Sequence, residues 1–144
     1  MFLDTNALVR AQYETAPNHA VARARILKTG QSGEALRISR QIVREYLATV
    51  TRPQSWSPAS SMNVALAQIA EFEANFEILE DGPQVAEKLA MLCREVPLGG
   101  RQIHDANIVA TMLAHGERRL LTFNAADFRR YCERIELVEM QTPG

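Results

Sequence analysis

Three aspartates beside short apolar segments are the residues of this sequence best suited to chemistry. Asp4 follows the apolar Phe2-Leu3, Asp127 comes shortly after the apolar pair at 120–121, and Asp105 lies at the start of a stretch with helical spacing of apolar residues. Two ionised carboxylates about 4 Å apart repel by roughly 4 kcal/mol at an effective dielectric constant of about 20. Acids that meet in one pocket therefore need a cation between them.

The absence of supporting His or Cys residues predicts which cation such acids would hold. Oxygen ligands alone favour Mg²⁺ or Mn²⁺ over zinc. His104 stands beside Asp105, but a shell of oxygens around Mg²⁺ has little use for imidazole, so we expect His104 to be a structural or substrate-contacting neighbour. A hard divalent ion binds phosphate and lowers the pKa of a bound water. The predicted chemistry is hydrolysis of a phosphodiester.

Each acid also has a purely structural interpretation. Asp4 and Asp105 each precede or begin a predicted helix, where Asp is a common N-cap. Asp127 could stabilise the start of a short helix through the helix dipole. Glu45 is the weakest candidate, because charged residues away from the apolar face of a helix are usually solvated. The apolar face of its helix is predicted to comprise Val43, Tyr46, Leu47 and Val50.

The segments that must position these residues alternate between strands and helices. Short strands are predicted at 2–3, 35–39, 76–79, 119–122 and 135–139. Helices are predicted from residue 7, from Pro17 to Lys28, at 41–50, at 61–72, at 83–95 with Asp81 as its cap, at 104–115 and at 125–131. This order predicts an α/β/α sandwich with a mostly parallel five-stranded sheet.

A parallel sheet would bring several polar residues to one edge. Ligands bind outside the carboxyl ends of parallel strands. Asp4 and Asn6 follow the first predicted strand, whereas Thr122, Asn124 and Asp127 follow the fourth. We therefore expect the two groups to face one another at the same edge of the sheet.

Length and composition predict one compact domain over residues 1–144. The chain is 47% hydrophobic and 23% charged, as in ordinary globular proteins. Cys93 and Cys132 stand far apart without a Cys-x-x-Cys pattern, which indicates reduced thiols and a cytoplasmic location. No apolar run approaches the roughly 20 residues that span a bilayer, and the first residues lack the features of a signal peptide. We expect neither export nor insertion into a membrane.

The charge distribution does not exclude a nucleic acid as the substrate. A net charge of −1 argues against binding by bulk attraction. Residues 10–52 nevertheless carry eight Lys or Arg against three acids, whereas residues 71–95 carry seven acids against two bases. One flank of the chain is therefore basic.

The candidate residues lie in four ordered segments, which are spread over nearly the whole chain. The segments are Phe2-Leu3-Asp4-Thr5-Asn6, residues 39–46 around Glu45, residues 103–110 around Asp105, and residues 121–128 around Asp127. Together they resemble the motifs of the PIN-domain family, and more closely those of its VapC-type toxins from prokaryotic toxin–antitoxin pairs. One such motif would be weak support, but four in this order are specific.

The resemblance implies a set of properties that the residue spacing does not give. It implies a catalytic, metal-binding quartet of Asp4, Glu45, Asp105 and Asp127, assisted by Asn6, Thr122 and Asn124. It also implies the sheet order 3-2-1-4-5 and an Mg²⁺- or Mn²⁺-dependent endoribonuclease that cleaves single-stranded or loop regions of RNA. A VapC-like protein would form a homodimer and bind a cognate antitoxin, for which the helices at 20–27 and 61–72 are candidate surfaces.

Three other classes compete with this interpretation. A PIN-like domain that has lost catalysis would serve as an RNA- or protein-binding module, and the intact acids argue against it. A phosphoaspartyl phosphatase would carry a second Asp where this chain has Asn6. A receiver domain would place its phosphoacceptor Asp directly after the third strand, where this chain has Leu79-Glu80-Asp81.

Overall fold

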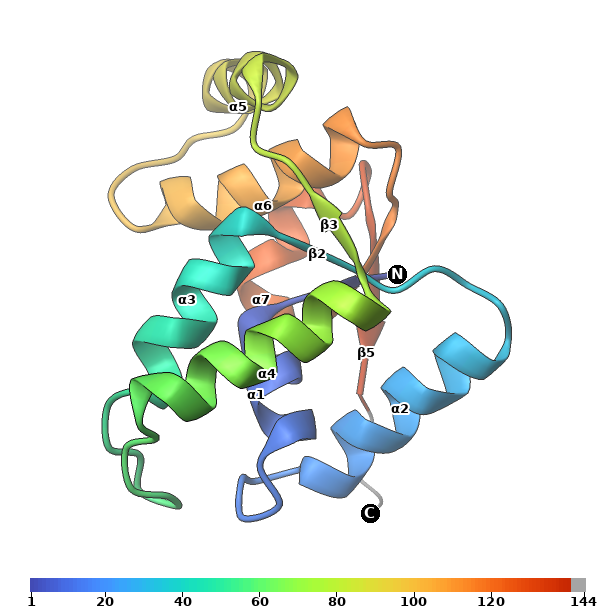
Figure 1. Ribbon diagram of the computed structural model, residues 1–144. Helices are drawn as coiled ribbons and strands as arrows, with labels where there is room; N and C mark the ends of the chain where they lie inside the picture. Colours follow the sequence, from blue (N-terminus) through green and yellow to red (C-terminus); the bar gives the residue numbers. More distant parts are fainter. Residues whose placement is uncertain (141–144) are drawn as a thin grey trace.

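A computed structural model describes residues 1–140 and contains a five-stranded parallel sheet (Figure 1). The strands are β1 (Phe2–Leu3), β2 (Arg37–Ser39), β3 (Glu77–Leu79), β4 (Arg119–Thr122) and β5 (Glu136–Glu139). Their order is β3-β2-β1-β4-β5, and every neighbouring pair is parallel. The predicted sheet and its order are confirmed. Residues 141–144, which the predicted domain includes, lie outside the described residues.

Helices connect the strands and cover the sheet. They are α1 (Thr5–Gln12), α2 (His19–Gln31), α3 (Arg40–Val50), α4 (Met62–Asn75), α5 (Pro83–Glu95), α6 (Gln102–Ala114) and α7 (Ala125–Phe128), the last followed by a 3₁₀ turn at Arg129–Tyr131. Figure 1 shows α2 and α4 on one side of the strands and α5 and α6 on the other. Among residues 1–140, no helix combines the length and the apolar character needed to cross a membrane.

The central strand is short but completely buried. Phe2 and Leu3 are both 0% exposed, and β1 pairs with β2 on one side and with β4 on the other. A strand that is buried on both faces is apolar throughout, as expected for a parallel sheet. The backbone N–H of Asp4 adds one more bond to this ladder, to the Leu121 carbonyl at 3.0 Å. The next residue begins α1, so Asp4 is fixed at the carboxyl edge of the sheet.

Several predicted helix boundaries differ from the structure, and the helix predicted at 61–72, for example, continues to Asn75. The helix expected to end near Lys28 continues to Gln31, because Thr29 is buried and its hydroxyl donates to the Arg25 carbonyl within the helix. The chain turns at Gly33, whose φ of +87° suits glycine. Asp81 does not cap α5, since Gly82 takes that position without a side-chain bond.

Candidate active site

Asp4 is the most buried acid of the site. Its side chain is 6% exposed, and Oδ1 accepts a hydrogen bond from the Thr5 backbone N–H at 2.8 Å, so it does cap α1. Oδ2 faces the other way, where it accepts from Thr122 Oγ1 at 2.7 Å and from Asn6 Nδ2 at 3.4 Å. The structural and chemical interpretations are therefore compatible, because one carboxylate serves both the helix and the cleft beside it.

Glu45 lies beside the buried face of α3 rather than opposite to it. The buried residues of this helix are Gln41, Ile42, Tyr46 and Val50, whereas the predicted face included Val43 and Leu47, which are only partly buried. Glu45 itself is half-buried. Its Oε2 accepts from Thr5 Oγ1 at 2.6 Å and its Oε1 from Gln41 Nε2 at 3.0 Å. The expected solvated position of Glu45 is wrong.

Asp105 and Asp127 occupy the opposite side of the site. Asp105 lies in the first turn of α6 and is half-buried, and among residues 1–140 no group donates a hydrogen bond to its carboxylate within bonding distance. Asp127 lies on α7 and is exposed. Its charge nevertheless acts on Asp105, as described below, so the two acids are neighbours.

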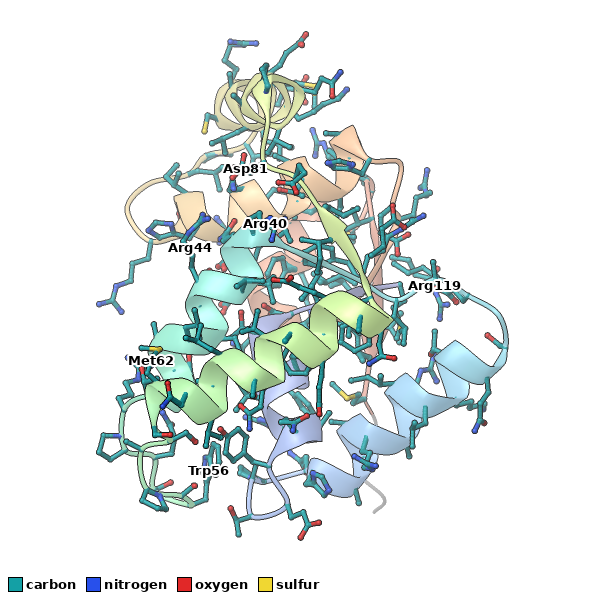
Figure 2. All side chains as sticks on the ribbon, viewed as in Figure 1. Arg40, Arg44, Trp56, Met62, Asp81 and Arg119 are labelled. Carbon is teal, nitrogen blue, oxygen red and sulfur yellow. The ribbon has the colours of Figure 1, made fainter. Side chains whose placement is uncertain are left out.

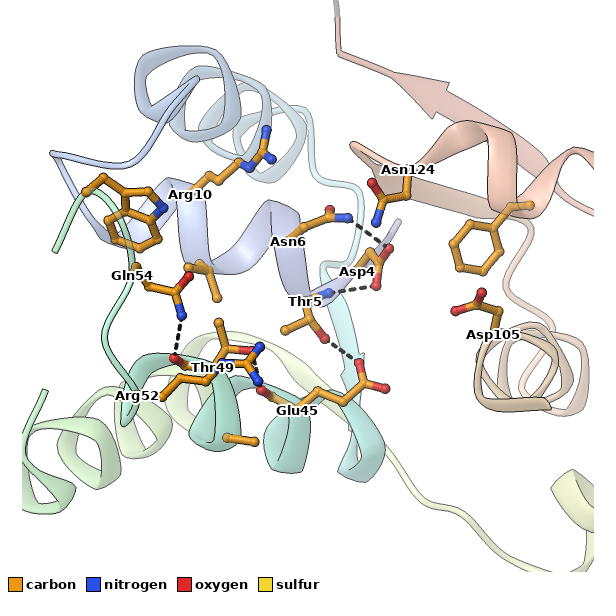
Figure 3. Close-up of a pocket in the computed structure, with 14 residues that line it drawn as sticks. Asp4, Thr5, Asn6, Arg10, Glu45, Thr49, Arg52, Gln54, Asp105 and Asn124 are labelled. Carbon is orange, nitrogen blue, oxygen red and sulfur yellow. Dashed lines mark hydrogen bonds between the residues drawn. The ribbon is translucent and has the colours of Figure 1, made fainter. Parts of the chain in front are cut away.

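Asp4, Glu45 and Asp105 line one cleft of about 470 Å³ (Figure 3). Figure 3 shows Asp105 across the cleft from Asp4, with Glu45 below both and Asn124 above. Asp127 and Thr122 do not contribute to its lining. The lining comprises Asp4, Thr5, Asn6, Val9, Arg10, Glu45, Ala48, Thr49, Arg52, Gln54, Trp56, Asp105, Asn124 and Phe128.

The pKa values of the two aspartates show how closely the acids interact. Burial raises the pKa of Asp4 from 3.8 to about 6, hydrogen bonds from Thr122 and Thr5 oppose this rise, and the charges of Glu45 and Asp105 add to it. The pKa of Asp105 is also raised, first by burial and then by the charges of Asp127 and Glu45. Each ionised acid thus makes the ionisation of its neighbours more costly.

Three polar residues hold the β1 and β4 ends of the site together. Thr122 Oγ1 donates to Asp4 and accepts from the Asn124 backbone N–H at 3.0 Å. Asn6 Oδ1 accepts from the Phe123 backbone N–H at 3.0 Å. Asn124 is exposed and lines the cleft. The structure therefore brings Asn6, Thr122 and Asn124 to the same corner as Asp4.

The donor set suits a hard divalent cation, although the side chains do not surround one point. Carboxylate oxygens are the ligands that Mg²⁺ and Mn²⁺ prefer, and neither His nor Cys is part of the cleft lining. Within the described part of the chain, no group donates a hydrogen bond to the Asp105 carboxylate. Among residues 1–140, no group of three or more His, Cys, Asp or Glu side chains is placed so that it could hold a metal ion. A shared ion would require the side chains to turn toward Asp4.

Sequence reasoning missed Gln41, which connects the helix that carries Glu45 with the helix that carries Asp105. Gln41 is buried, and its Nε2 donates to Glu45 and to the His104 carbonyl at 2.8 Å. Its Oε1 accepts from Asn107 Nδ2 at 2.8 Å. The only available signal was its spacing four residues before Glu45, which places both side chains on one face of a helix. Gln41 thereby ties α3 to α6, which carries Asp105.

Comparison with known proteins places this arrangement in context. The sequence matches the PIN domain family over residues 1–134. No curated protein matches it significantly.

Solved structures similar to this chain include toxin–antitoxin proteins. VapBC2 from Rickettsia felis, bound to a fragment of its promoter DNA, has a TM-score of 0.69 and 16% identity, over 97% of this chain and 98% of that one. VapBC-1 from nontypeable Haemophilus influenzae has a TM-score of 0.68 and 16% identity, over 98% of both chains. VapC20 from Mycobacterium tuberculosis, described as a sarcin-ricin loop cleaving toxin, has a TM-score of 0.67 and 14% identity, over 94% of this chain and 95% of that one. At these identities the similarity shows a shared fold.

Proposed function

This chain belongs to the PIN domain family, and from that premise we propose that it is a metal-dependent endoribonuclease. Its substrate would be single-stranded or loop regions of RNA, in which it hydrolyses phosphodiester bonds. The observation that carries this proposal is the meeting of Asp4, Glu45 and Asp105 in one cleft. They come from three separate parts of the chain, and one of them is almost fully buried. Such a cluster is unfavourable without a cation.

The four acids have different roles in this proposal. Asp4, Glu45 and Asp105 would hold the Mg²⁺ or Mn²⁺ ion, and Asp127 would contribute through its charge on Asp105. The bound ion would neutralise the carboxylates, bind the scissile phosphate and lower the pKa of an attacking water. Thr122 and Asn6 fix the orientation of Asp4, whereas Asn124 presents a polar side chain to the cleft.

A protein partner is the second part of the proposal. The similar structures include VapBC toxin–antitoxin complexes, and we propose that this chain likewise is a toxin that forms a homodimer and binds an antitoxin. Four large apolar side chains on α2 and α4 are about half exposed, and apolar patches on a protein surface are common at contacts with other proteins. They are Leu27, Met62, Val64 and Leu66. These helices include both surfaces suggested by the sequence.

Cleavage of a labelled single-stranded RNA in the presence of Mn²⁺ or Mg²⁺ tests the enzymatic proposal. We expect EDTA to abolish cleavage. Asp4→Asn and Asp105→Asn should each reduce the rate by at least about 100-fold, because even groups that only orient metal ligands cost about 10–100-fold. Glu87→Gln is the matched control, since Glu87 is an exposed acid on α5 outside the cleft. The proposal would be contradicted by cleavage that persists in EDTA, or by full activity in folded Asp4→Asn and Asp105→Asn proteins.

The alternative is a PIN-like module that binds RNA or protein without catalysis. The separation of the acids within the cleft is the observation that favours it. In that case the wild-type chain would bind RNA and leave it intact at every concentration of Mn²⁺. A cleavage product that depends on Asp4 excludes this alternative.

A further inference from the structure

The cleft continues past the acids toward a second group of residues. Arg10, Arg52, Gln54 and Trp56 line this part. Figure 3 shows Arg10, Arg52 and Gln54 on the far side of Asp4 from Asp105. The cleft therefore has an acidic end and an end with two guanidinium groups and an aromatic ring, which we call the basic end.

Both arginines of the basic end lack an acidic partner. Among residues 1–140, no carboxylate forms an ion pair with Arg10 or Arg52, whereas several other arginines do pair with carboxylates. The Arg10 guanidinium lies 4.2 Å from the centre of the Phe123 ring, and burial lowers its pKa. A partly buried cation without a counter-ion is a ready partner for an anion such as phosphate.

Trp56 lies in the loop between α3 and α4 (Figure 2). The backbones of Gln54 and Ser57 form a two-way bridge around it, with N···O distances of 2.8 and 3.4 Å. Gln54 Nε2 also donates to the Thr49 carbonyl at 3.0 Å, which anchors the loop to α3. The Trp56 ring contacts Tyr13 at 5.7 Å between centroids. The indole is therefore fixed by Tyr13 and the loop while it lines the cleft.

We propose that the basic end is a subsite for one nucleotide of single-stranded RNA next to the scissile phosphate, with its base stacked on Trp56 and its phosphate bound by Arg10 and Arg52. This inference rests on the proposed nuclease function and adds a subsite to it. An aromatic ring beside guanidinium groups is the pattern with which proteins bind single strands, since every base presents a flat face and every linkage a charge. A duplex keeps its bases stacked inside and cannot use the ring.

Trp56 allows a direct test, because it is the only tryptophan of the chain. We use a single-stranded RNA of about ten nucleotides and the Asp105→Asn protein in EDTA, conditions under which we expect no cleavage during the measurement. We expect the RNA to quench the emission of Trp56. A series of decamers, each with a single abasic nucleotide at a different position, locates the stacked base. Only the decamer that lacks this base should fail to quench Trp56. Inorganic polyphosphate, which has charge without bases, should leave the emission almost unchanged.

Affinity measured by the anisotropy of labelled RNA separates stacking from charge. We expect Trp56→Leu to weaken binding about tenfold and Trp56→Phe to retain most of it, since loss of base stacking lies in this range. The slope of log K against log salt is negative, and Arg52→Gln should reduce its magnitude by about 0.7, the value for one phosphate contact on a single strand. Trp56→Leu should leave the slope unchanged. Arg94→Gln, an exposed arginine on α5 outside the cleft, is the matched control.

Failure of the subsite is distinguishable from failure of the nuclease. If the wild-type chain cleaves RNA but Trp56 emission does not respond and Trp56→Leu binds as tightly as wild type, the subsite proposal is wrong and the nuclease proposal stands. If the wild-type chain cleaves no RNA with Mn²⁺, the nuclease proposal itself is wrong. Quenching by an acidic peptide and not by RNA would overturn the choice of ligand.

Discussion

Thr122 Oγ1 donates a hydrogen bond to Asp4 Oδ2 at 2.7 Å, although 118 positions separate the two residues in the chain. Both residues stand at the carboxyl ends of neighbouring strands, β4 and β1, so the parallel pairing of these strands brings them together. Thr122 is only 1% exposed, so water has little access to the position of its hydroxyl. This bond ties the orientation of the buried carboxylate to the centre of the sheet.

Removing the Thr122 hydroxyl should destabilise the fold and the site together. We expect Thr122→Val to lower the free energy of unfolding by about 1–3 kcal/mol, because a buried acceptor on Asp4 is left without its closest donor. The pKa of Asp4 should rise further, since the Thr122 bond lowers it. Urea denaturation at pH 7 measures the loss, and Thr122→Ser should restore it. If Thr122→Val and the wild type had equal free energies of unfolding, the hydrogen bond would contribute nothing to stability.

The raised pKa of Asp4 predicts a pH-dependent stability for the metal-free protein. Folding raises this pKa from 3.8 to about 6, so the folded chain binds the proton more tightly than the unfolded chain does. The protonated carboxyl contributes stability that is fully present below about pH 4 and is lost as the pH rises through about 6. A shift of this size corresponds to a loss on the order of 3 kcal/mol.

Comparison with Asp4→Asn isolates this contribution from other titrating groups. Asp4→Asn removes the titrating carboxyl, so this variant should not lose the contribution as the pH rises. Its free energy of unfolding relative to that of the wild type should therefore increase from about pH 4 to about pH 6 and stay constant above pH 6. Urea denaturation in EDTA across this range measures the difference. A difference that does not change with pH would mean that folding leaves the pKa of Asp4 near its ordinary value.

The position of Asp4 could be predicted from the sequence, because it depends on a general rule. Apolar Phe2-Leu3 indicates a buried strand, and parallel strands open their carboxyl ends at one edge. The same rule placed Thr122 and Asn124 at the edge that holds Asp4, and in the structure Thr122 donates to Asp4 and accepts from the Asn124 backbone N–H. The prediction of these positions depended on the parallel pairing of the strands and not on the chemistry of the individual side chains.

The surroundings of Glu45 could not be predicted by the same reasoning. Apolar periodicity placed Tyr46 and Val50 correctly on the buried face of α3. It also assigned Val43 and Leu47 to that face, where packing buries Ile42 instead. Gln41 is polar, so a search for apolar spacing discards it although it is buried. Trp56 and Arg52 lie in a loop without a repeating pattern, and the contact of the Trp56 ring with Tyr13, far away in the sequence, cannot be read from local spacing.

Gln41 should position Glu45 without contacting the substrate. We expect Gln41→Leu to keep the volume of the side chain but to leave Glu45 and the His104 carbonyl without their shared donor. The rate constant for RNA cleavage should fall about 10- to 100-fold, as for other residues that orient ligands, with little change in KM. Gln84→Leu, at an exposed position of α5, is the matched control. A change confined to KM would instead assign Gln41 to substrate binding.

Metal binding should stabilise the folded chain, because the unfolded chain does not bring the acids together. An ion at about 100 times its dissociation constant adds about 2.7 kcal/mol to the free energy of unfolding, which for a chain of this size raises Tm by about 5–10 °C. We expect Mn²⁺ to produce such a rise in the wild-type and Glu87→Gln proteins. The rise should be lost in Asp4→Asn and Asp105→Asn and reduced in Asp127→Asn, since Asp127 lies outside the cleft lining. Calorimetry at millimolar Mn²⁺ measures these shifts. Equal shifts in all five proteins would place the ion elsewhere, and no shift in any of them would mean that the acids do not form a metal site.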